Sequence, residues 1–330
     1  MASSIRVHHY GGAEQLRWEQ TPMPQPGRGE VLIRQTAVGL NYIDVYHRTG
    51  FYPVPELPFT PGIEAAGVVE AVGEGVELYA PGDRVAYCKG APGAYAQFRV
   101  IGQENVIKLP DHIQDAQAAA VLLKGQTAHM LLRRTFPVGP GMTVLIQAAA
   151  GGVGVLLCQW AKALGATVIG TVGSEEKAKF ASENGCGYPI LYTKENVKER
   201  VREITGGTGC NVVYDSVGAA TFDGSINSLV PFGLLVSFGQ SSGPVPPVDV
   251  KQLMDKGSLF LTRPTLLHYK RQYEEYVTGA AELFELIKQG RIKVHVGQSY
   301  YLSDAASAHR DLEARNTHGS TVLFVDAENR

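Results

Sequence analysis

The pattern of apolar and polar positions divides the chain near Gln114. Before Gln114, short apolar or alternating segments rich in β-branched residues are separated by Pro and Gly, a pattern typical of strands joined by tight turns. The strands predicted in this part are residues 5–10, 16–21, 30–38, 65–72, 84–88 and 94–100. Short strands spaced this closely favour a compact barrel or sandwich.

After Gln114 an Ala-rich helix is predicted as far as Leu132, and strands then alternate with helices. The predicted strands are residues 143–147, 167–172, 211–216 and 233–238, and the predicted helices are 153–164, 175–184, 196–204 and 221–230. Short buried strands that alternate with helices predict a parallel, doubly wound sheet. The last predicted elements do not continue this alternation cleanly, so we expect the tail to pack back on the N-terminal β domain. They are a strand at 258–262, a helix at 273–288, and a strand, helix and strand at 294–301, 305–314 and 321–325.

Composition narrows the class of protein. Of the 330 residues, 44% are hydrophobic and 19% are charged, which supports a large packed core and argues against disorder. The formal net charge of -2 gives no basic surface for nucleic acid. No apolar run approaches the roughly 18 residues of a membrane span, and the N-terminus lacks a signal-peptide core. The four cysteines are far apart and form no C-x-x-C pair, so we expect a reduced, cytoplasmic enzyme without a disulfide framework or zinc knuckle.

A Gly-rich segment lies between a predicted strand and a predicted helix. From Ala149 through Gly151 to Gly154 it reads A-x-G-x-x-G, one residue away from the dinucleotide fingerprint. Small residues let the backbone approach a pyrophosphate, and the helix N-terminus presents N–H groups and partial positive charge. An ordinary tight turn would share the motif, but the strand–helix unit that follows is the context of a cofactor site. We therefore expect this loop to bind a dinucleotide.

The end of the second strand of this unit indicates which nicotinamide cofactor is used. An NAD site usually carries an acid there, roughly 20 residues after the loop. The strand runs instead into Gly173 and Ser174, and Glu175 and Glu176 resemble the acidic first turn of a helix capped by Ser174. Lys177 could meet a 2′-phosphate or could be a solvated surface lysine. The missing acid is the stronger argument, and NADPH is favoured over NADH.

One further motif points to a hydrolase and is set aside. Residues 239–243 match G-x-S-x-G, but a nucleophile elbow leads straight into a helix, which Pro244 forbids. A cofactor-facing loop at the carboxyl end of a strand fits this segment better.

Five segments of the chain together resemble one superfamily. They are residues 38–46 (VGLNYIDVY), 61–69 (PGIEAAGVV), 81–85 (PGDRV), 149–154 (AAGGVG) and 215–218 (DSVG). The combination resembles the medium-chain dehydrogenases/reductases, and more closely their quinone oxidoreductases, the ζ-crystallin-like branch. The resemblance covers essentially the whole chain. It implies an α/β protein with a GroES-like β-barrel catalytic domain (1–124), an inserted Rossmann domain with a doubly wound parallel sheet that binds NADP (125–264), and a C-terminal return to the catalytic domain (265–330).

The resemblance also implies that this chain lacks metal. Zinc-binding members of the superfamily carry Cys where Asn41 stands and His where Ile63 stands, and they carry a four-Cys lobe that has no counterpart between Arg84 and Val100. Zinc stabilises the alkoxide during alcohol oxidation. Without it, an electron-poor acceptor such as a quinone is the natural substrate, followed by activated enones.

Individual roles are carried over position by position. The residues implied on the catalytic side are Asn41, Asp44, Tyr46 and Tyr52. The residues implied in cofactor binding are Asn41, Thr127, Gly151, Gly152, Val153, Gly173, Ser174, Lys177, Tyr192, Ser216, Phe238, Gly239, Ser241, Arg263 and Arg315. Several also have structural interpretations: Asn41 could cap the helix that follows it, Phe238 could lie in the core, and Arg315 could be a surface helix residue.

These observations predict an NADPH-dependent reductase that transfers hydride or electrons to small quinones without metal. Two alternatives stay open: an NADPH-dependent enone or alkenal reductase on the same fold, and a ζ-crystallin-like protein that binds NADPH or RNA. The near-neutral charge does not support RNA. A homodimer is the family expectation, formed by pairing the edge strand near 258–262, because an exposed edge invites such pairing.

Overall fold

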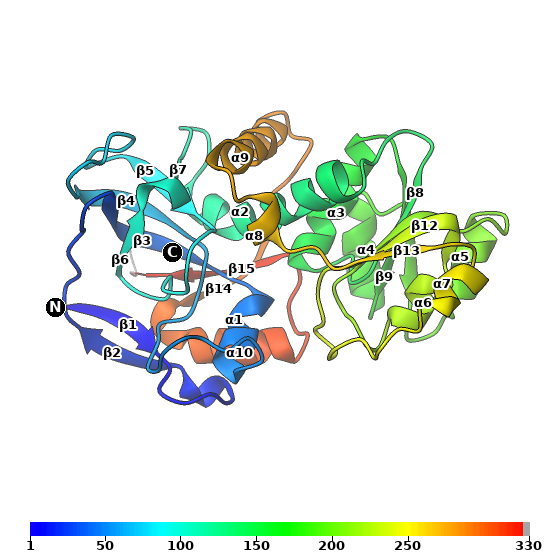
Figure 1. Ribbon diagram of the computed structural model, residues 1–330, viewed down its shortest axis with the longest axis horizontal. Coiled ribbons are helices and arrows are strands. Elements are labelled where there is room, and N and C mark those ends of the chain that lie inside the picture. Colours follow the sequence, from blue (N-terminus) through cyan, green and yellow to red (C-terminus); the bar gives the residue numbers. More distant parts are fainter. Residues whose placement is uncertain (326–330) are drawn as a thin grey trace. The chain divides into compact units, whose positions relative to one another are not determined.

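Two structural units make up the computed structural model, which describes residues 1–325 (Figure 1). Unit 1 comprises residues 1–124, 280–288 and the described chain from Lys293 onward, and unit 2 comprises residues 125–279 and 289–292. The chain passes from unit 1 to unit 2 within α2 (Asp115–His129) and returns within α9 (Tyr273–Lys288), and residues 289–292 after α9 belong again to unit 2.

Unit 1 is built on a seven-stranded sheet in the order β14-β15-β3-β4-β5-β7, with β6 paired to β3. Its strands are β3 (Glu30–Leu40), β4 (Ala65–Val72), β5 (Arg84–Tyr87), β6 (Phe98–Gly102), β7 (Ile107–Lys108), β14 (Val296–Tyr301) and β15 (Ser320–Phe324). All pairs are antiparallel except β14 with β15. A two-stranded sheet of β1 (Ala2–Arg6) and β2 (Arg17–Thr21) and two helices, α1 (Tyr42–Thr49) and α10 (Ala305–Glu313), complete the unit. The C-terminal strands thus join the sheet of the N-terminal segment, as the sequence predicted.

Unit 2 is a six-stranded parallel sheet in the order β10-β9-β8-β11-β12-β13. Its strands are β8 (Thr143–Ile146), β9 (Thr167–Val172), β10 (Tyr188–Leu191), β11 (Cys210–Asp215), β12 (Leu229–Ser237) and β13 (Phe260–Thr262). Its helices are α3 (Gly152–Ala163), α4 (Glu175–Glu183), α5 (Val197–Ile204), α6 (Phe222–Ile226), α7 (Lys251–Asp255) and α8 (Leu266–Tyr269). The chain builds outward from β8 in one direction and from β11 in the other, so the doubly wound parallel sheet is confirmed. The point between β8 and β11 is the topological switch point at which such sheets bind ligands.

Several predicted elements are displaced in the structure. The helix predicted at 221–230 is wrong after Ile226, because β12 begins at Leu229 and the residue before Pro231 is disfavoured in a helix. The helix predicted to Leu132 gives way after His129 to a π-helical segment, Met130–Thr135. The first predicted strand, 5–10, is replaced by β1 at Ala2–Arg6 and one isolated bridge at Val7. The strand predicted at 94–100 is β6, which begins only at Phe98.

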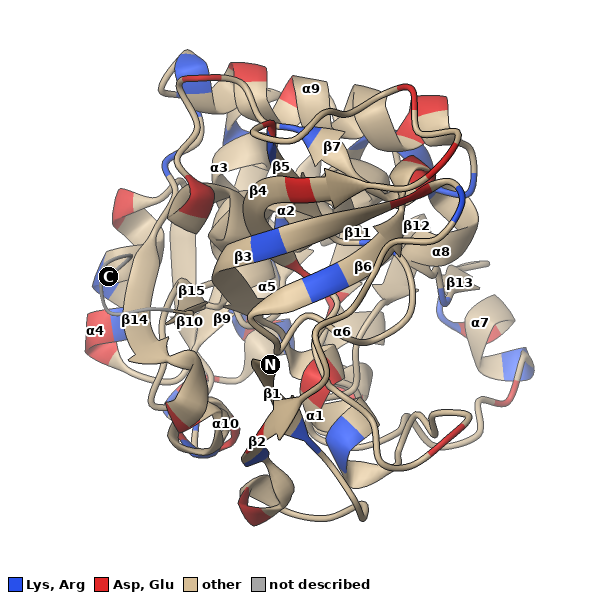
Figure 2. Ribbon diagram, turned by 90° about the vertical axis from the view of Figure 1, so that its left-hand side faces the viewer, with Lys and Arg blue, Asp and Glu red and all other residues tan. Residues whose placement is uncertain are grey.

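Residues of opposite charge alternate along the elements that face the viewer in Figure 2. On the face seen in Figure 2, acidic and basic residues of the described chain are interspersed along helices and loops. No helix among residues 1–325 combines the length and apolar character that crossing a bilayer requires.

Candidate functional site

The Gly-rich loop connects β8 to α3 and is shaped by close packing. Ala148 adopts the left-handed conformation, with a φ of 55°. A Cβ on Gly154 would collide with the Ala148 carbonyl oxygen and would lie 2.9 Å from the Cα of Ala149, so only Gly fits there. Gly151 is the N-cap residue of α3 and has an extended backbone conformation. Because it has no side chain, it makes no capping hydrogen bond to the first turn of the helix. The first turn of α3, with Gly152 and Val153, therefore presents its N–H groups to an anion.

A buried polar chain holds this loop to the next strand. The N–H of Ala149 donates to the Thr171 carbonyl at 2.9 Å, and the N–H of Ala148 donates to Thr171 Oγ1 at 3.2 Å. Thr171 Oγ1 in turn donates to Gln147 Oε1 at 2.6 Å, and Gln147 Nε2 donates to Ser225 Oγ at 2.9 Å. The loop is thus fixed from beneath before any ligand arrives, which lowers the entropy that binding must remove.

The carboxyl end of β9 carries the residues expected at a 2′-phosphate. Ser174 Oγ accepts a hydrogen bond from the Lys177 backbone N–H at 3.3 Å and so caps α4. A Cβ on Gly173 would lie 2.6 Å from the hydroxyl oxygen of Tyr192, so Gly is what lets this ring approach the strand end. Glu175, the nearest acid, forms an exposed ion pair with Lys194 at 2.8 Å. Gly173, Ser174, Lys177 and Tyr192 are therefore neighbours at the end of the strand.

The loops after β11 and β12 are joined to each other. The Ser241 N–H donates to the Ser216 carbonyl at 3.3 Å, and a Cβ on Gly239 would lie 2.5 Å from that same oxygen. Arg263, which follows β13, donates from Nη1 to the carbonyl oxygens of Ser237 and Gly239, both at 3.0 Å. The structure thus gives Arg263 a role in holding the loop around Phe238.

Asp215, the first residue of the DSVG segment at 215–218, holds these two loops together. Its buried Oδ1 accepts hydrogen bonds from the N–H groups of Val217 and Gly218 at 2.8 and 3.0 Å. Its Oδ2 accepts from Thr221 Oγ1 and Ser225 Oγ at 2.8 and 2.7 Å. The carboxylate fixes the turn that leaves β11 and shares Ser225 with the polar chain beneath the Gly-rich loop.

All of these unit 2 features follow the carboxyl ends of parallel strands, and parallel strands end at one edge of a sheet. The predicted cofactor residues from Gly151 to Arg263 are therefore brought to that edge, while Thr127 lies in α2. Arg315 belongs to unit 1, where it follows α10 in the left-handed conformation with a φ of 61°.

In unit 1, Asn41 stands at the N-terminus of α1 with its side chain turned toward Glu64. Asn41 Nδ2 donates to Glu64 Oε2 at 2.7 Å and to the Gly39 carbonyl at 3.2 Å. Glu64 is fully buried; its Oε1 accepts from the Leu123 N–H at 2.6 Å, and Lys124 Nζ lies 3.4 Å from its Oε2. Since the amide is planar, this arrangement aims the Asn41 carbonyl oxygen away from Glu64. Sequence reasoning missed Glu64 and Lys124, although a charge inside an apolar run is itself a signal.

Asp44 begins a second buried network. Its Oδ2 accepts from the Asn41 N–H at 2.9 Å and from the Tyr95 hydroxyl at 3.1 Å. The Tyr95 hydroxyl lies 3.0 Å from His309 Nε2, and Arg48 Nη1 donates to His309 Nδ1 at 3.1 Å. A neutral imidazole that accepts at Nδ1 must carry its proton on Nε2, so hydrogen bonds run in one direction from Arg48 to Asp44.

Burial controls the protonation of this network. It raises the pKa of Asp44 to about 7, against the lowering effect of the Asn41 N–H and Tyr95. Burial, together with the Arg48 charge, lowers the pKa of His309 to about 3. Arg48 itself is held by a bidentate pair with Glu313, both contacts at 2.8 Å. No sequence motif marks this set of residues, because its members come from distant segments of the chain.

Aromatic rings surround Tyr46. Its ring centroid lies 5.2 Å from that of Tyr42, 5.3 Å from Phe51 and 5.1 Å from Tyr52. The Tyr52 N–H donates to the Tyr46 carbonyl at 3.0 Å. Phe51 is 43% exposed, so the cluster offers apolar ring surface at the boundary with solvent. Tyr46 and Tyr52, both predicted site residues, are therefore brought together.

Comparison with known proteins places this geometry in a family. The family described as "Alcohol dehydrogenase GroES-like domain" matches residues 27–111, and "Zinc-binding dehydrogenase" matches residues 152–284. A quinone oxidoreductase of Pseudomonas aeruginosa is 50% identical over 98% of this chain and 100% of its own. The chain belongs to the quinone oxidoreductases of the medium-chain dehydrogenase/reductase superfamily. The resemblance stated from the sequence is confirmed.

Two further members of the superfamily bear on the site. The crystal structure of Escherichia coli quinone oxidoreductase complexed with NADPH superimposes with a TM-score of 0.96 at 46% identity, covering 98% of this chain and 100% of that one. A 2-haloacrylate reductase of Burkholderia is 44% identical over 99% of this chain and 100% of its own. This quinone oxidoreductase homologue thus has relatives named for two kinds of acceptor.

Proposed function

We propose that this protein is an NADPH-dependent reductase of small quinones. The observation that carries the proposal is the carboxyl edge of the unit 2 sheet. There a helix N-terminus without a side-chain cap adjoins a strand end that has Lys177 and Tyr192 in place of an acid. The similarity to a quinone oxidoreductase solved with NADPH supports the same cofactor. Unit 2 is accordingly proposed as the cofactor-binding domain and unit 1 as the catalytic domain.

Different groups of residues bind the pyrophosphate, the 2′-phosphate and the nicotinamide of the cofactor. The N–H groups of the α3 first turn face the pyrophosphate, and Lys177, Ser174 and Tyr192 hold the 2′-phosphate, whose charge favours a cation and hydroxyl donors. Ser216, Phe238, Gly239 and Ser241 line the nicotinamide side, with Arg263 fixing the backbone of that loop. Bound NADPH supplies the hydride.

On the acceptor side, the Tyr46 hydroxyl donates to the acceptor oxygen that becomes negative, and a donor aimed at that oxygen stabilises the transition state. Asn41 already donates both Nδ2 hydrogens to Glu64 and Gly39, so it contributes its carbonyl oxygen to the site. Glu64 sets the orientation of the Asn41 amide, while Tyr52 and Phe51 supply the apolar ring surface against which a planar acceptor packs. Asn41 and Ile63 replace the metal ligands of zinc-binding relatives, and an isoleucine offers no ligand atom. We therefore propose metal-independent reduction.

A second candidate is reduction of activated alkenes, which the similarity to a 2-haloacrylate reductase favours. The two candidates share the cofactor and differ in the acceptor. Following loss of NADPH absorbance against simple quinones, alkenals and 2-haloacrylates separates them. We expect the highest kcat/KM with a quinone. Turnover of haloacrylates with quinones left untouched would instead establish the alkene reductase.

The proposal for Lys177 predicts a change in cofactor preference. Lys177→Ala removes a cation that only the 2′-phosphate needs, so KM for NADPH should rise about tenfold, as loss of a charged hydrogen bond implies. KM for NADH should stay unchanged. Lys179→Ala is the matched control, since it removes an exposed lysine of the same helix. An unchanged ratio of NADPH to NADH efficiency in the Lys177 variant would remove this residue from the pocket.

Location and assembly are also proposals. All four cysteines are free and buried, which fits the reducing cytoplasm. A homodimer through β13 is supported by the position of that strand at the edge of the unit 2 sheet. Interspersed charges on the face seen in Figure 2 favour catalysis over an RNA-binding role.

A further inference from the structure

Two buried cysteines of unit 2 lie against each other directly behind the phosphate loop. Cys158 belongs to α3 and Cys186 to the turn before β10, and their exposed fractions are 0% and 2%. The two thiols lie close enough to share a side-chain hydrogen bond, which raises the pKa of Cys158 and lowers that of Cys186. Cys158 Sγ also lies 4.0 Å from the carbonyl oxygen of Ala149, a residue of the Gly-rich loop.

The backbones that carry the two thiols are in direct contact. Gly185 has a φ of 96°, and a Cβ on it would lie 2.8 Å from the Cys158 carbonyl oxygen and 3.2 Å from the Cα of Gln159. Gly170 of β9 leaves room for the second sulfur, because a Cβ there would lie 2.9 Å from Cys186 Sγ. A disulfide requires Cα atoms that lie close together, and the packing of Gly185 on the Cys158 backbone brings the two segments into contact.

The two thiols differ in the way that a redox pair requires. The hydrogen bond with Cys158 and the backbone N–H of Tyr188 lower the pKa of Cys186, while burial opposes them. The same hydrogen bond and burial raise the pKa of Cys158. Cys186 is therefore the nucleophile, because thiolates and not thiols react.

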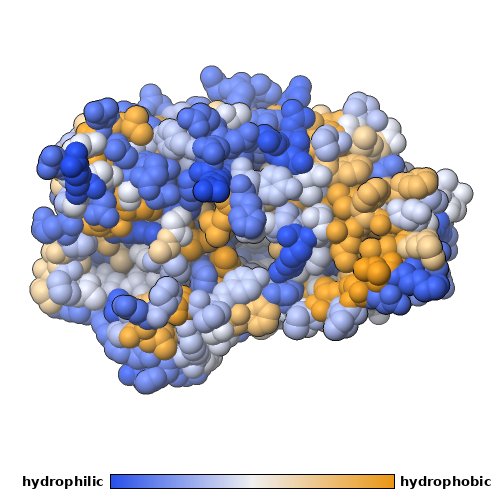
Figure 3. All heavy atoms as spheres, viewed as in Figure 1, coloured by the Kyte–Doolittle hydropathy of each residue, from blue (hydrophilic) through white to orange (hydrophobic). Residues whose placement is uncertain are grey.

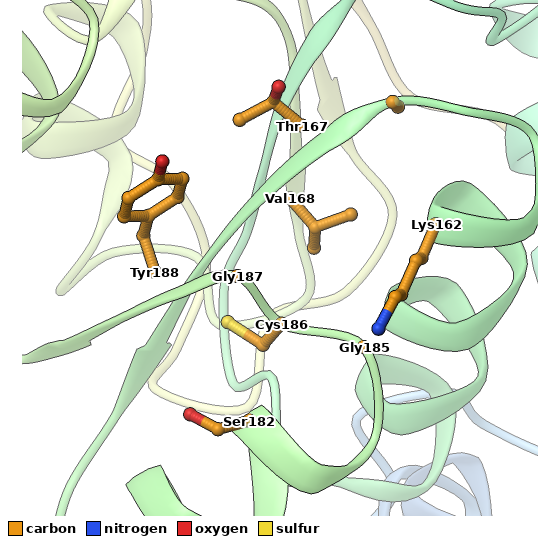
Figure 4. A pocket seen from close by; sticks show the side chains of 9 residues that line it. Lys162, Thr167, Val168, Ser182, Gly185, Cys186, Gly187 and Tyr188 are labelled. Carbon is orange, nitrogen blue, oxygen red and sulfur yellow. The ribbon is translucent and has the colours of Figure 1, made fainter.

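A pocket gives small molecules access to Cys186. It has a volume of about 410 Å³ and is lined by Lys162, Ala166, Thr167, Val168, Ser182, Gly185, Cys186, Gly187 and Tyr188. Figure 4 shows the Lys162 side chain reaching from α3 toward the turn at Gly185 and Cys186. The volume admits a small peroxide.

We propose that Cys158 and Cys186 form an oxidative modification site, at which a small peroxide converts the two thiols into a disulfide. The Cys186 thiolate attacks one peroxide oxygen, the O–O bond breaks, and the departing hydroxide takes up a proton as water. This leaves a sulfenic acid on Cys186. The Cys158 sulfur then attacks that sulfur and a second water leaves. Two thiols lose two electrons, and one peroxide is reduced to two waters.

The test is peroxide treatment of the whole protein, followed by alkylation of remaining thiols and tryptic mass mapping. We expect the loss of two of the four alkylatable cysteines, a cross-link between peptides 135–162 and 180–194, and full reversal by a thiol reductant. Cys158→Ser should leave a sulfenic acid on Cys186 that dimedone traps. Cys186→Ser should abolish oxidation of Cys158.

Cys210→Ser is the matched control, because Cys210 is equally buried and its pKa is raised to about 12 by burial. This variant should form the cross-link as the wild type does. Four alkylatable thiols after peroxide treatment, or a cross-link involving Cys88 or Cys210, would overturn the proposal.

The position of the pair behind the phosphate loop predicts a second readout, which rests on the proposed function. A disulfide draws Cys158 toward Cys186 and away from the Ala149 carbonyl, so the oxidised protein should bind NADPH more weakly and recover on reduction. Mass mapping needs no cofactor, so a cross-link in a protein whose reduced form also fails to bind NADPH would count against the proposed function alone.

Discussion

The carboxyl group of Asp44 is fully buried, and one of its oxygens, Oδ2, accepts two hydrogen bonds. The second oxygen, Oδ1, is buried and has no hydrogen-bond partner among the described residues. The buried charges that face it are Lys124, which favours ionisation, and Glu64, which opposes it. An uncompensated buried charge is costly, so this group holds its proton to unusually high pH.

This behaviour predicts a pH dependence of stability. The pKa of Asp44 is about 7 when folded and 3.8 ordinarily, so between these values the folded state holds a proton that the unfolded state lacks. Stability from this group is therefore full below pH 3.8 and falls by up to about 1.4 kcal/mol per pH unit as pH rises toward 7. His309 acts oppositely: its folded pKa of about 3 makes stability rise with pH up to 6.5.

Asp44→Asn removes only the first of these two effects. Thermal unfolding of the variant should therefore show a Tm that climbs with pH between 4 and 6.5 more steeply than that of the wild type. The surface substitution Asp111→Asn should follow the wild-type curve. Parallel curves for the wild type and the Asp44 variant would mean that Asp44 is already ionised throughout this range.

At the residue scale, the sequence predicts the site residues that belong to motifs. It does not predict the hydrogen-bonded residues that only the fold brings together. Asn41 and Lys177 could be predicted as site residues because each occupies a position in a local motif. Tyr95 and His309 could not, because their hydrogen bond joins positions 214 residues apart. The sequence around Tyr95 and His309 does not distinguish them from an ordinary buried tyrosine or histidine.

At the scale of elements, the unit formed by β8, the Gly-rich loop and α3 depends on one close approach. A Cβ on Gly154 meets the backbone oxygen of Ala148, which no rotamer change relieves. Gly154→Ala should therefore shift the helix away from the loop, weaken NADPH binding by at least tenfold and lower the Tm.

The control for this substitution is Gly224→Ala. Gly224 also lies in a helix of unit 2, but its added Cβ would lie 3.9 Å from the Cβ of Val197, an ordinary contact. Alanine favours the helix over glycine, so this variant should keep its cofactor affinity and its stability. Calorimetric titration with NADPH measures both variants. Equal affinities would show that the loop accepts the extra methyl group.

Helices and strands were predicted well where a local hydrophobic pattern defines them. They were predicted poorly where pairing with a distant strand determines the secondary structure. The strand predicted at 65–72 coincides with β4, which is bounded by clear turn signals. The helix predicted at 221–230 ran past Ile226 into residues that form β12 (Leu229–Ser237), and the pairing of β12 with β11 and β13 makes this segment a strand. The short strand β10 was missed because its four residues, YPIL, carry no alternation and include Pro.

At the scale of the whole molecule, unit 2 leaves an apolar edge uncovered. Phe260 and Leu261 of the edge strand β13 are 59% and 36% exposed. Val250 and Met254, in and beside α7, are also exposed. Figure 3 shows hydrophobic residues gathered at the right-hand end of the view, where Figure 1 places β12, β13 and α7. An apolar edge strand is a template for pairing with a second copy.

A two-fold dimer built on this edge brings β13 against itself, so a charge placed on it meets the same charge in the partner. Phe260→Glu and Phe260→Lys should each give monomers by size-exclusion chromatography with light scattering, while an equimolar mixture of the two should recover the dimer. Tyr188→Glu is the control, since Tyr188 is 46% exposed on β10 at the opposite edge of the same sheet. That variant should stay dimeric. If both charged Phe260 variants remain dimers when alone, the interface lies elsewhere on the molecule, because like charges could not be tolerated at the centre of a self-paired strand.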